Sequence, residues 1–283
     1  MKLVPDCLPC TLRQLLEAAR MATDDPVVQT QIMDEGIVLL AKYRDYRNSP
    51  ELCRAMQAII TARTGNADPY SALKDKDVAA ALQIYPMLKQ YVSEGDHLRR
   101  ALKVSATGNI IDSAVGGNVR IEDCVLRELQ RPFVICDESE LRRQLKTAGT
   151  LLFVGDNSGE TVFDRVLLES LPHLEITYAA RGGPALNDAT VKEALASGLD
   201  GCARVISTGC ALPGVNLDET TEAFQEAFRS ADIVICKGQG NYETLSDVGR
   251  NAFFLLKAKC AVLSRLLGVA MGDYVFRYIG PEH

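Results

Sequence analysis

The spacing of hydrophobic residues divides the chain into two parts with different patterns. Up to about residue 130, apolar residues recur at intervals of three and four, which is the period of an amphipathic helix. The clearest helical segments are residues 10–21, 27–43, 50–64 and 78–92. Polar residues directly before Pro50 and Pro69 mark helix starts. We therefore expect the first 130 residues to be helical.

From Arg131 onward the pattern changes to short apolar and β-branched runs. We expect strands at 133–136, 151–154, 175–178, 204–207, 232–236 and 253–256. Helical segments at 139–147, 161–171, 189–197 and 219–230 lie between them. Strands that alternate with helices favour a parallel sheet covered on both faces. The sequence thus predicts an α/β protein: an N-terminal helical domain (1–130), then a three-layer α/β domain with a mostly parallel sheet (131–283).

Composition and charge narrow the classes of partner. The 283 residues include 31 Lys and Arg against 37 Asp and Glu, a net charge of −6, and no basic run is present. Binding to a nucleic-acid backbone is therefore not expected. No apolar run reaches the roughly 18–20 residues of a membrane span, and the first residues lack the order of a secretory signal. Nine cysteines without an export signal indicate a reducing compartment, so we expect a cytoplasmic protein without a disulfide framework.

Ligand sites in parallel sheets lie beyond the carboxyl ends of the strands. The strand at 151–154 is followed by Gly155-Asp156-Asn157-Ser158-Gly159 and then a helix. Carboxylate and amide oxygens suit a hard cation, and the free N–H groups of a helix start suit an anion. A site that suits both a hard cation and an anion would suit a metal-bound phosphate. The alternative is that Asp156 or Ser158 only caps the next helix.

Two further strand ends carry similar chemistry. After 175–178, Arg181 could hold an anion and Asp188 could be a metal ligand, although an N-cap and a surface arginine would explain them too. After 232–236, Lys237 enters a glycine-flanked loop, where it could neutralise a phosphoryl oxygen. The alternative for Lys237 is a surface lysine whose stem alone is buried.

The sequence lacks the motifs that other classes of enzyme require. The chain has neither a Gly-x-Gly-x-x-Gly fingerprint after a strand nor a phosphate-binding Gly-x-x-x-x-Gly-Lys-Ser/Thr loop. A Ser or Cys triad would need a histidine, and His97 and His173 are expected at the surface while His283 is terminal. Chemistry without histidine favours assistance by a metal ion.

These strand-end segments resemble those of the DUF89 family, the damage-control phosphatases with an ARMT1-like metal-binding domain. Further matches run from end to end of the chain: Cys7-Leu8-Pro9-Cys10, Asp68-Pro69-Tyr70 with Lys74, Gly108-Asn109-Ile110-Ile111-Asp112 and Lys259-Cys260. The Cys-x-x-Cys pair is typical of the archaeal and bacterial branch. One departure is Ser113-Ala114, where that branch usually has an aromatic residue and a glycine.

The resemblance implies a divalent-metal-dependent phosphatase that hydrolyses small phosphorylated metabolites, such as sugar phosphates or damaged phospho-metabolites. Its metal ligands would be Asp156, Asn157 and Asp188, and the ion would be Mg²⁺, Mn²⁺, Co²⁺ or Ni²⁺. Asp156 and Lys237 would be the catalytic residues. The substrate would be bound by Glu160, Arg181, Asn187, Lys237, Asn241 and Glu243.

Some points stay open at the level of the sequence. The attacking group is either water or the Asp156 carboxylate, and water is favoured because Asp156-Asn157-Ser158 lacks the Asp-x-Asp of an aspartyl nucleophile of the haloacid-dehalogenase type. Cys7 and Cys10 could form a soft-metal site with Cys260, a redox pair or a plain helix start. Alternative functions are S-adenosylmethionine-dependent carboxyl methylation and non-enzymatic metal binding by thiols. The oligomeric state is open.

Overall fold

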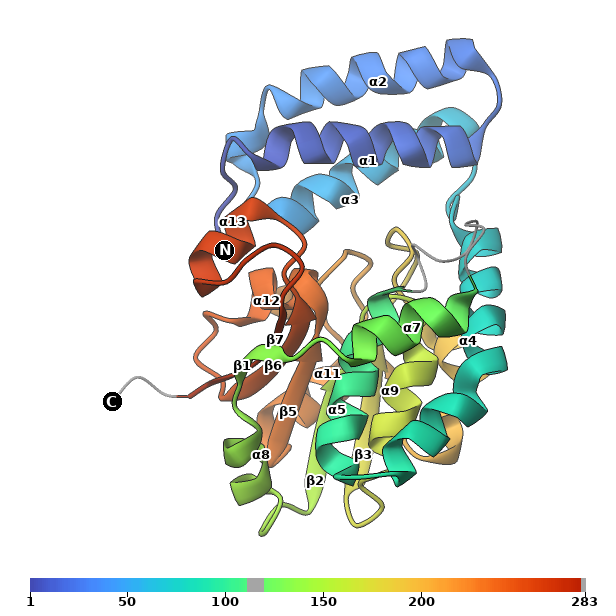
Figure 1. Cartoon of the computed structure of the whole chain (residues 1–283). Coiled ribbons are helices and arrows are strands. Elements are labelled where there is room, and N and C mark those ends of the chain that lie inside the picture. Colours follow the sequence, from blue (N-terminus) through green and yellow to red (C-terminus); the bar gives the residue numbers. More distant parts are fainter. Residues whose placement is uncertain (111–119, 281–283) are drawn as a thin grey trace.

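A seven-stranded sheet forms the centre of the computed structural model, which describes residues 1–110 and 120–280 (Figure 1). The departure at Ser113-Ala114 lies outside the described residues. The strand order is β1-β7-β6-β5-β2-β3-β4. The strands are β1 (Phe133–Cys136), β2 (Thr150–Val154), β3 (Glu175–Ala180), β4 (Arg204–Ser207), β5 (Ile233–Lys237), β6 (Ala252–Lys257) and β7 (Tyr274–Ile279).

The sheet is mostly parallel, which confirms the predicted fold class. Neighbouring strands pair in parallel except β6 and β7, which are antiparallel. Strands β1 and β7 therefore run opposite to the other five. Strand β7 was not predicted from the sequence, and it lies inside the sheet rather than at its edge.

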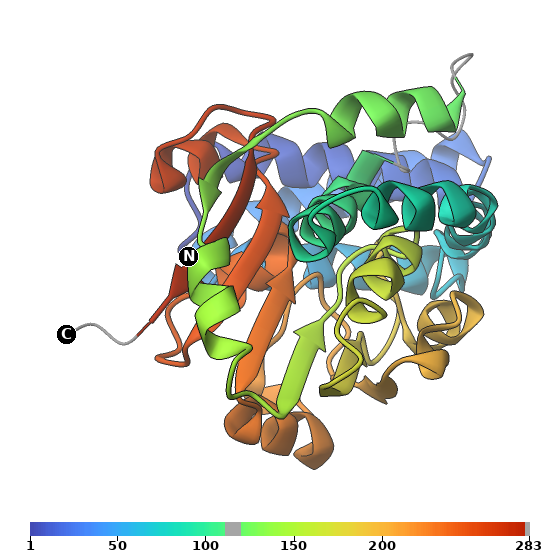
Figure 2. The ribbon, with the colours of Figure 1, turned by 60° about the horizontal axis from the view of Figure 1, so that its bottom comes forward.

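Alternating side chains of each strand enter two separate cores, as the two-residue period of a strand requires. Leu151 and Phe153 of β2 pack on one face, and Leu152 and Val154 pack on the other. The first face is covered by α4 (Ser71–Ser93), α5 (His97–Thr107), α7 (Ile121–Leu129) and α9 (Glu160–Leu168). The second is covered by α11 (Glu222–Ser230), α12 (Gly238–Leu245) and α13 (Ala261–Leu267). Figure 2 shows helices on both sides of the strands.

The first three helices form a layer of their own. They are α1 (Cys7–Ala22), α2 (Pro26–Leu40) and α3 (Ser49–Thr64). Side chains of Asp25 and Asn48 accept backbone hydrogen bonds at the starts of α2 and α3, as N-caps do. Leu15, Ile32 and Met56 are among the buried residues of their common cluster. In Figure 1 this layer lies beyond the end of the sheet near α12 and α13.

The packing groups the helices before residue 130 in two ways. Helices α4, α5 and α7 share a core with the strands, whereas α1–α3 have a separate cluster. The division into domains at residue 130 stays a prediction. The shorter helices are α8 (Glu138–Gln144) and α10 (Val191–Ala196). Within the part of the chain that the structure describes, no helix combines the length and the apolar character needed to span a bilayer.

Candidate active site

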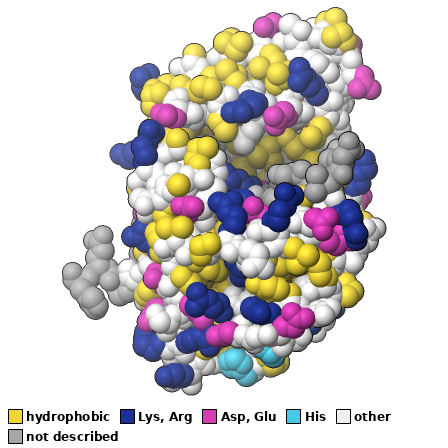
Figure 3. Space-filling model, viewed as in Figure 1, with side chains coloured by type: hydrophobic (Ala, Val, Ile, Leu, Met, Phe, Trp, Pro, Cys, Tyr) yellow, Lys and Arg dark blue, Asp and Glu magenta, His cyan; other side chains and the backbone are white. Residues whose placement is uncertain are grey.

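The predicted strand-end residues meet at one edge of the sheet because β6, β5, β2 and β3 are neighbours that run in the same direction. Val154 at the end of β2 pairs with Ala179 and with Cys236. Lys237 is the last residue of β5, and Arg181 follows β3 directly. Figure 3 shows a hollow under α1–α3 on one face of the molecule, with an apolar upper wall and charged side chains below.

The three predicted metal ligands lie on two loops that are joined by backbone hydrogen bonds. Asn157 and Asp188 form an isolated antiparallel bridge. The Ala189 N–H donates to the Asp156 carbonyl at 2.7 Å, and the Ser158 N–H donates to the Asn187 carbonyl at 2.9 Å. All three predicted ligands are buried. The loops thus hold two carboxylates and an amide side by side.

The structure contradicts the view that these residues are only helix caps. The N-cap of α9 is Gly159, without any side-chain cap bond, so neither Asp156 nor Ser158 caps that helix. The N-cap of α10 is Thr190, which forms a capping box with Glu193. Asp188 therefore does not cap α10.

Electrostatics at this place favour a cation. Burial, together with the nearby charges of Asp188 and Glu160, raises the pKa of Asp156 well above its ordinary value. Burial also raises the pKa of Asp188, although Arg181 opposes that shift. Around these two loops four carboxyls are buried, Asp156, Glu160, Asp164 and Asp188, against two buried basic groups, Arg181 and Lys237. The excess of two acidic groups and the all-oxygen donor set fit a hard divalent ion.

Arg181 lies behind the carboxylates rather than at the surface. Its side chain is 1% exposed. Its Nε donates to Asp188 Oδ2 at 2.6 Å, and one terminal nitrogen lies 3.5 Å from Asp156 Oδ1. The other terminal nitrogen donates to Asn241 Oδ1 at 2.9 Å. The guanidinium therefore fixes the orientation of two predicted metal ligands.

Asn241 ties the same loops together from α12. Its amide nitrogen donates to the Gly155 carbonyl at 2.9 Å and to the Lys237 carbonyl at 2.7 Å. The nearby Gly238 adopts a φ of +82°, and a Cβ on it would lie 1.9 Å from Asp156 Oδ2. A glycine is thus required where α12 begins beside the Asp156 carboxylate.

Lys237 is buried, so the alternative of a surface lysine is wrong. Its exposure is 1%. Its ammonium lies 2.8 Å from Glu160 Oε2, from Asp164 Oδ1 and from the Ser105 carbonyl. An ammonium has three donors, and these three acceptors match them. Burial opposes the charged form of Lys237, but the two carboxylates outweigh it and raise the pKa of Lys237.

Asp164 is a functional candidate that the sequence analysis missed. It is fully buried, accepts a hydrogen bond from Ser105 Oγ at 2.6 Å and contacts Tyr178 Oη at 3.2 Å. The available signal was its spacing, since Glu160 and Asp164 are four residues apart and so share one face of α9. Asn109 and Asn157 donate to the other oxygen of Glu160, at 2.6 and 3.1 Å.

A third cation near the site is Lys259, which follows the end of β6. Lys259 is exposed, and its charge opposes the raised pKa values of Asp156 and Asp188 and helps to lower that of Glu160. Burial acts against the ionisation of Glu160, but Lys237 and Lys259 together outweigh it. Lys259 matched a motif of the resemblance, yet no role was predicted for it.

Of the two remaining predicted substrate residues, Asn187 directly precedes Asp188, whereas Glu243 lies on α12. Glu243 is buried on α12, accepts a hydrogen bond from Gln239 at 2.7 Å and lines a cavity of about 410 Å³ with Met1 and Arg47. The side chain of Asn187 is half-buried.

Cys260 lies near enough to Cys7 and Cys10 for its charge to raise the pKa of both thiols. Burial raises the pKa of Cys7, and Glu243, Cys260 and Cys10 add to that shift. Cys260 is the N-cap of α13 and accepts hydrogen bonds from Leu263 N and Gln239 Nε2. Over residues 1–110 and 120–280, no group of three or more His, Cys, Asp or Glu side chains could hold a metal ion. The soft-metal site therefore stays a prediction.

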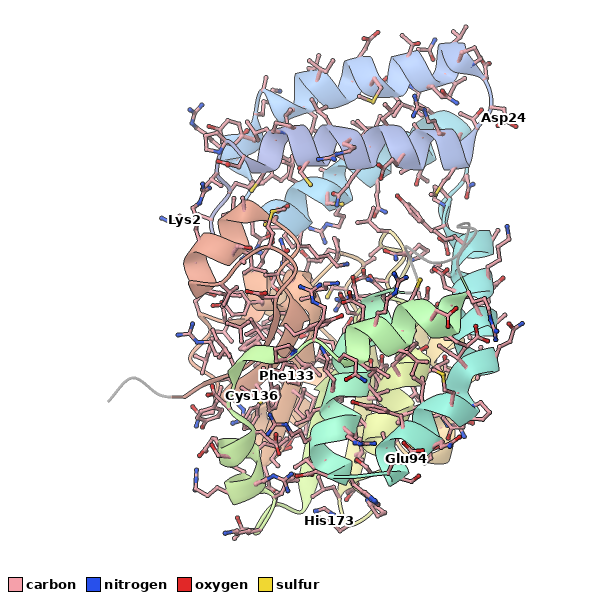
Figure 4. The ribbon with its side chains drawn as sticks, viewed as in Figure 1. Lys2, Asp24, Glu94, Phe133, Cys136 and His173 are labelled. Carbon is pink, nitrogen blue, oxygen red and sulfur yellow. The ribbon has the colours of Figure 1, made fainter. Side chains whose placement is uncertain are left out.

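Two of the three histidines lie at the surface, as expected. His97 and His173 are exposed, and His283 is outside the described residues. Figure 4 places His173 at the end of the molecule opposite α1–α3.

Comparison with known proteins identifies the family. Residues 3–275 match the model of the damage-control phosphatase ARMT1-like domain. A damage-control phosphatase of Pyrococcus horikoshii is 35% identical, over 97% of each chain, and one of Archaeoglobus fulgidus is 30% identical, over 99% of this chain and all of its relative. The crystal structure of a DUF89 family protein from P. horikoshii superimposes with a TM-score of 0.90 over 98% of each chain. The chain therefore belongs to the damage-control phosphatase ARMT1-like (DUF89) family.

Proposed function

We propose that this protein is a divalent-metal-dependent phosphatase that acts on small phosphorylated metabolites, such as sugar phosphates or damaged phospho-metabolites. The observation that carries the proposal is the excess of buried carboxyls at the sheet edge, where Asp156, Asn157 and Asp188 lie together. The names of two relatives, both damage-control phosphatases, support the same reaction.

Asp156, Asn157 and Asp188 would hold the ion, which we propose to be Mg²⁺, Mn²⁺, Co²⁺ or Ni²⁺. When bound, such an ion supplies Lewis-acid chemistry, which withdraws charge from a phosphoryl group. Arg181 keeps the two carboxylates oriented through its contacts with Asp188 and Asp156. It therefore acts as a positioning residue rather than by direct contact with substrate.

Lys237 and Lys259 supply positive charge to the site in two different ways. Lys237 fixes Glu160 and Asp164 through two contacts of 2.8 Å, so Glu160 is held ionised next to the predicted ligands. Lys237 would reach a phosphoryl oxygen only by exchanging one of its three acceptors. Lys259 is exposed and close enough to influence all three carboxyls, so it can attract the anionic substrate.

The proposal is tested by phosphate release from a panel of sugar phosphates and phosphorylated cofactors, with and without each metal ion. We expect metal-dependent release that Asp188→Ala abolishes and Cys7→Ser leaves unchanged. Release that depends on Cys7 rather than Asp188 would favour the thiol site instead. Methyl transfer from S-adenosylmethionine without any phosphate release would show that the enzyme class is wrong.

A further inference from the structure

Leu186 has a backbone conformation that leucine seldom adopts. Its φ is +52°, and it is the only non-glycine with a positive φ among the described residues. A bulky residue in this region is a true outlier, whereas asparagine tolerates it well. The next residue is Asn187, yet the chain places the left-handed turn on the leucine. Such strain persists only where the surroundings hold the residue in place.

The surroundings of Leu186 belong to the N-terminal helices. Its side chain packs against the buried cluster of α1–α3, although Leu186 itself follows β3. It shares a cavity of about 10 Å³ with Leu15 and Ala18 of α1 and with Cys53, Met56 and Ile60 of α3. A space this small leaves room for about one water molecule at most. The Leu186 side chain therefore fills its seat, the space between these residues of α1 and α3.

The loop that Leu186 anchors contains a predicted metal ligand. Asp188 is two residues further along, and its N–H donates to the Ala185 carbonyl at 3.0 Å, which closes a tight turn around Leu186. On either side of Asp188, Asn187 O accepts from Ser158 N and Ala189 N donates to Asp156 O. A displacement of Leu186 would therefore move both carboxylate loops.

We propose that Leu186 is a positioning residue, which locks the Asp188 loop into a seat between α1 and α3 and so makes the helical layer a part of the metal site. The inference rests on the proposed metal-dependent function. It also gives the strained leucine a reason, because asparagine or glycine would satisfy the backbone but leave the seat empty.

The test compares two substitutions that separate side chain from backbone. Leu186→Asn relieves the backbone and removes the anchor, and Leu186→Met keeps an apolar side chain of similar volume. We expect Leu186→Asn to weaken Mn²⁺ binding about tenfold or more, as the loss of a group that orients a ligand does, and Leu186→Met to bind nearly as wild type. Binding is measured by calorimetry on the free protein, without substrate.

A matched control keeps loss of stability apart from loss of positioning. Ile32 of α2 is fully buried in the same cluster but does not line the cavity beside Leu186. Ile32→Ala should lower the unfolding temperature and leave Mn²⁺ affinity unchanged. Met56→Ala opens the seat from the opposite side and should weaken Mn²⁺ binding as Leu186→Asn does.

Amide hydrogen exchange supplies a readout that needs no metal. The amides of Ser158 and Ala189 should exchange faster in Leu186→Asn but not in Ile32→Ala. Unchanged exchange together with unchanged Mn²⁺ affinity in Leu186→Asn would overturn the inference. Absence of Mn²⁺ binding in the wild type, with the exchange rates as expected, would instead overturn the proposed metal site and leave the anchoring of the loop intact.

Discussion

Lys237 shows how the setting of one residue changes its interpretation. Its side chain emerges from a buried strand, and the sequence left open whether the ammonium reaches solvent or substrate. In the structure the ammonium lies between Glu160, Asp164 and the Ser105 carbonyl. A buried charge of this kind is stable only when its partners are complete. The residue is therefore tied both to the fold and to the state of Glu160.

We predict that Lys237→Met lowers turnover by about 10²–10³, the usual cost of one lost electrostatic contact at a reacting site. It should also lower the unfolding temperature, because two carboxylates lose their buried partner. Lys237→Arg should restore stability only in part, since a planar guanidinium does not replace a compact ammonium. Turnover and thermal unfolding are measured together for both variants.

The double variant Lys237→Met with Asp164→Asn is the control for this prediction. Removing one of the opposing carboxylates should recover part of the stability without recovering turnover. A Lys237→Met protein within about twofold of wild-type turnover, less than ~0.5 kcal/mol, would remove Lys237 from the mechanism.

Lys103 of α5 is a second buried lysine, in a different setting. Its Nζ lies 3.2 Å from the centre of the Tyr274 ring and has no hydrogen-bond acceptor within the described parts of the chain. Burial lowers the pKa of Lys103 to about 7 from an ordinary value of 10.5. Between about pH 7 and 10.5, the unfolded chain therefore carries a proton on Lys103 that the folded protein does not bind.

We predict that Lys103→Met raises the unfolding temperature at pH 7. The penalty of the buried amine is fully present below about pH 7 and disappears as the pH rises toward 10.5. The advantage of the variant should shrink over that range. Thermal unfolding of both proteins at several pH values checks the sign, and an advantage that grows with pH would contradict the explanation.

Among the elements, the start of α12 is the one fitted most closely to the site. Gly238 has a φ of +82° and no room for a Cβ beside Asp156. Gly249 has a similar φ of +74°, but nothing lies within 4 Å of where its Cβ would be. The two positions therefore separate the backbone cost of an alanine from the effect of its contact with Asp156.

We predict that Gly238→Ala and Gly249→Ala both lose about 1 kcal/mol or more of stability, because alanine is strained at positive φ. Only Gly238→Ala should also lose metal-dependent activity, since its Cβ displaces Asp156. Urea unfolding and phosphate release measure the two effects. Equal activity in the two variants would show that Asp156 tolerates the displacement.

The elements also show what the sequence could predict. The strands at 151–154 and 232–236 were predicted because each contains an uninterrupted apolar run of four residues, as strands buried on both faces do. β7 was missed because Arg277 interrupts its run of aromatic and aliphatic residues. The strand ends predicted the grouping of Asp156 and Asp188, because topology alone brings them together. Asp164 could not be predicted so readily, since its burial depends on α5 and β3, which are distant in sequence.

At the scale of the whole molecule, the candidate site joins all three hydrophobic clusters. Glu160 and Asp164 come from a helix on one face of the sheet, and Asn241 comes from a helix on the other. Leu186, which follows β3, packs against the third cluster, that of the α1–α3 layer. An ion bound at this junction would link parts of the molecule that otherwise pack separately.

We predict that Mn²⁺ raises the unfolding temperature of the wild-type protein, because an ion that binds only the folded state stabilises it. The gain is about 2.7 kcal/mol at a concentration 100 times the dissociation constant. Asp188→Ala should show no such gain, and Cys7→Ser should show the full one. If Asp188→Ala gains as much as wild type and Cys7→Ser does not, the stabilising ion binds at the thiols.

The interior position of β7 has a consequence for how the chain is made. Among the described strands β1 pairs only with β7, and β7 separates β1 from β6. On the ribosome β1 therefore emerges well over a hundred residues before its sheet partner. Until β7 is synthesised, the outward edge of β6 also lacks its neighbour, and open strand edges of this kind favour aggregation. The sheet therefore cannot be completed before β7 has left the ribosome.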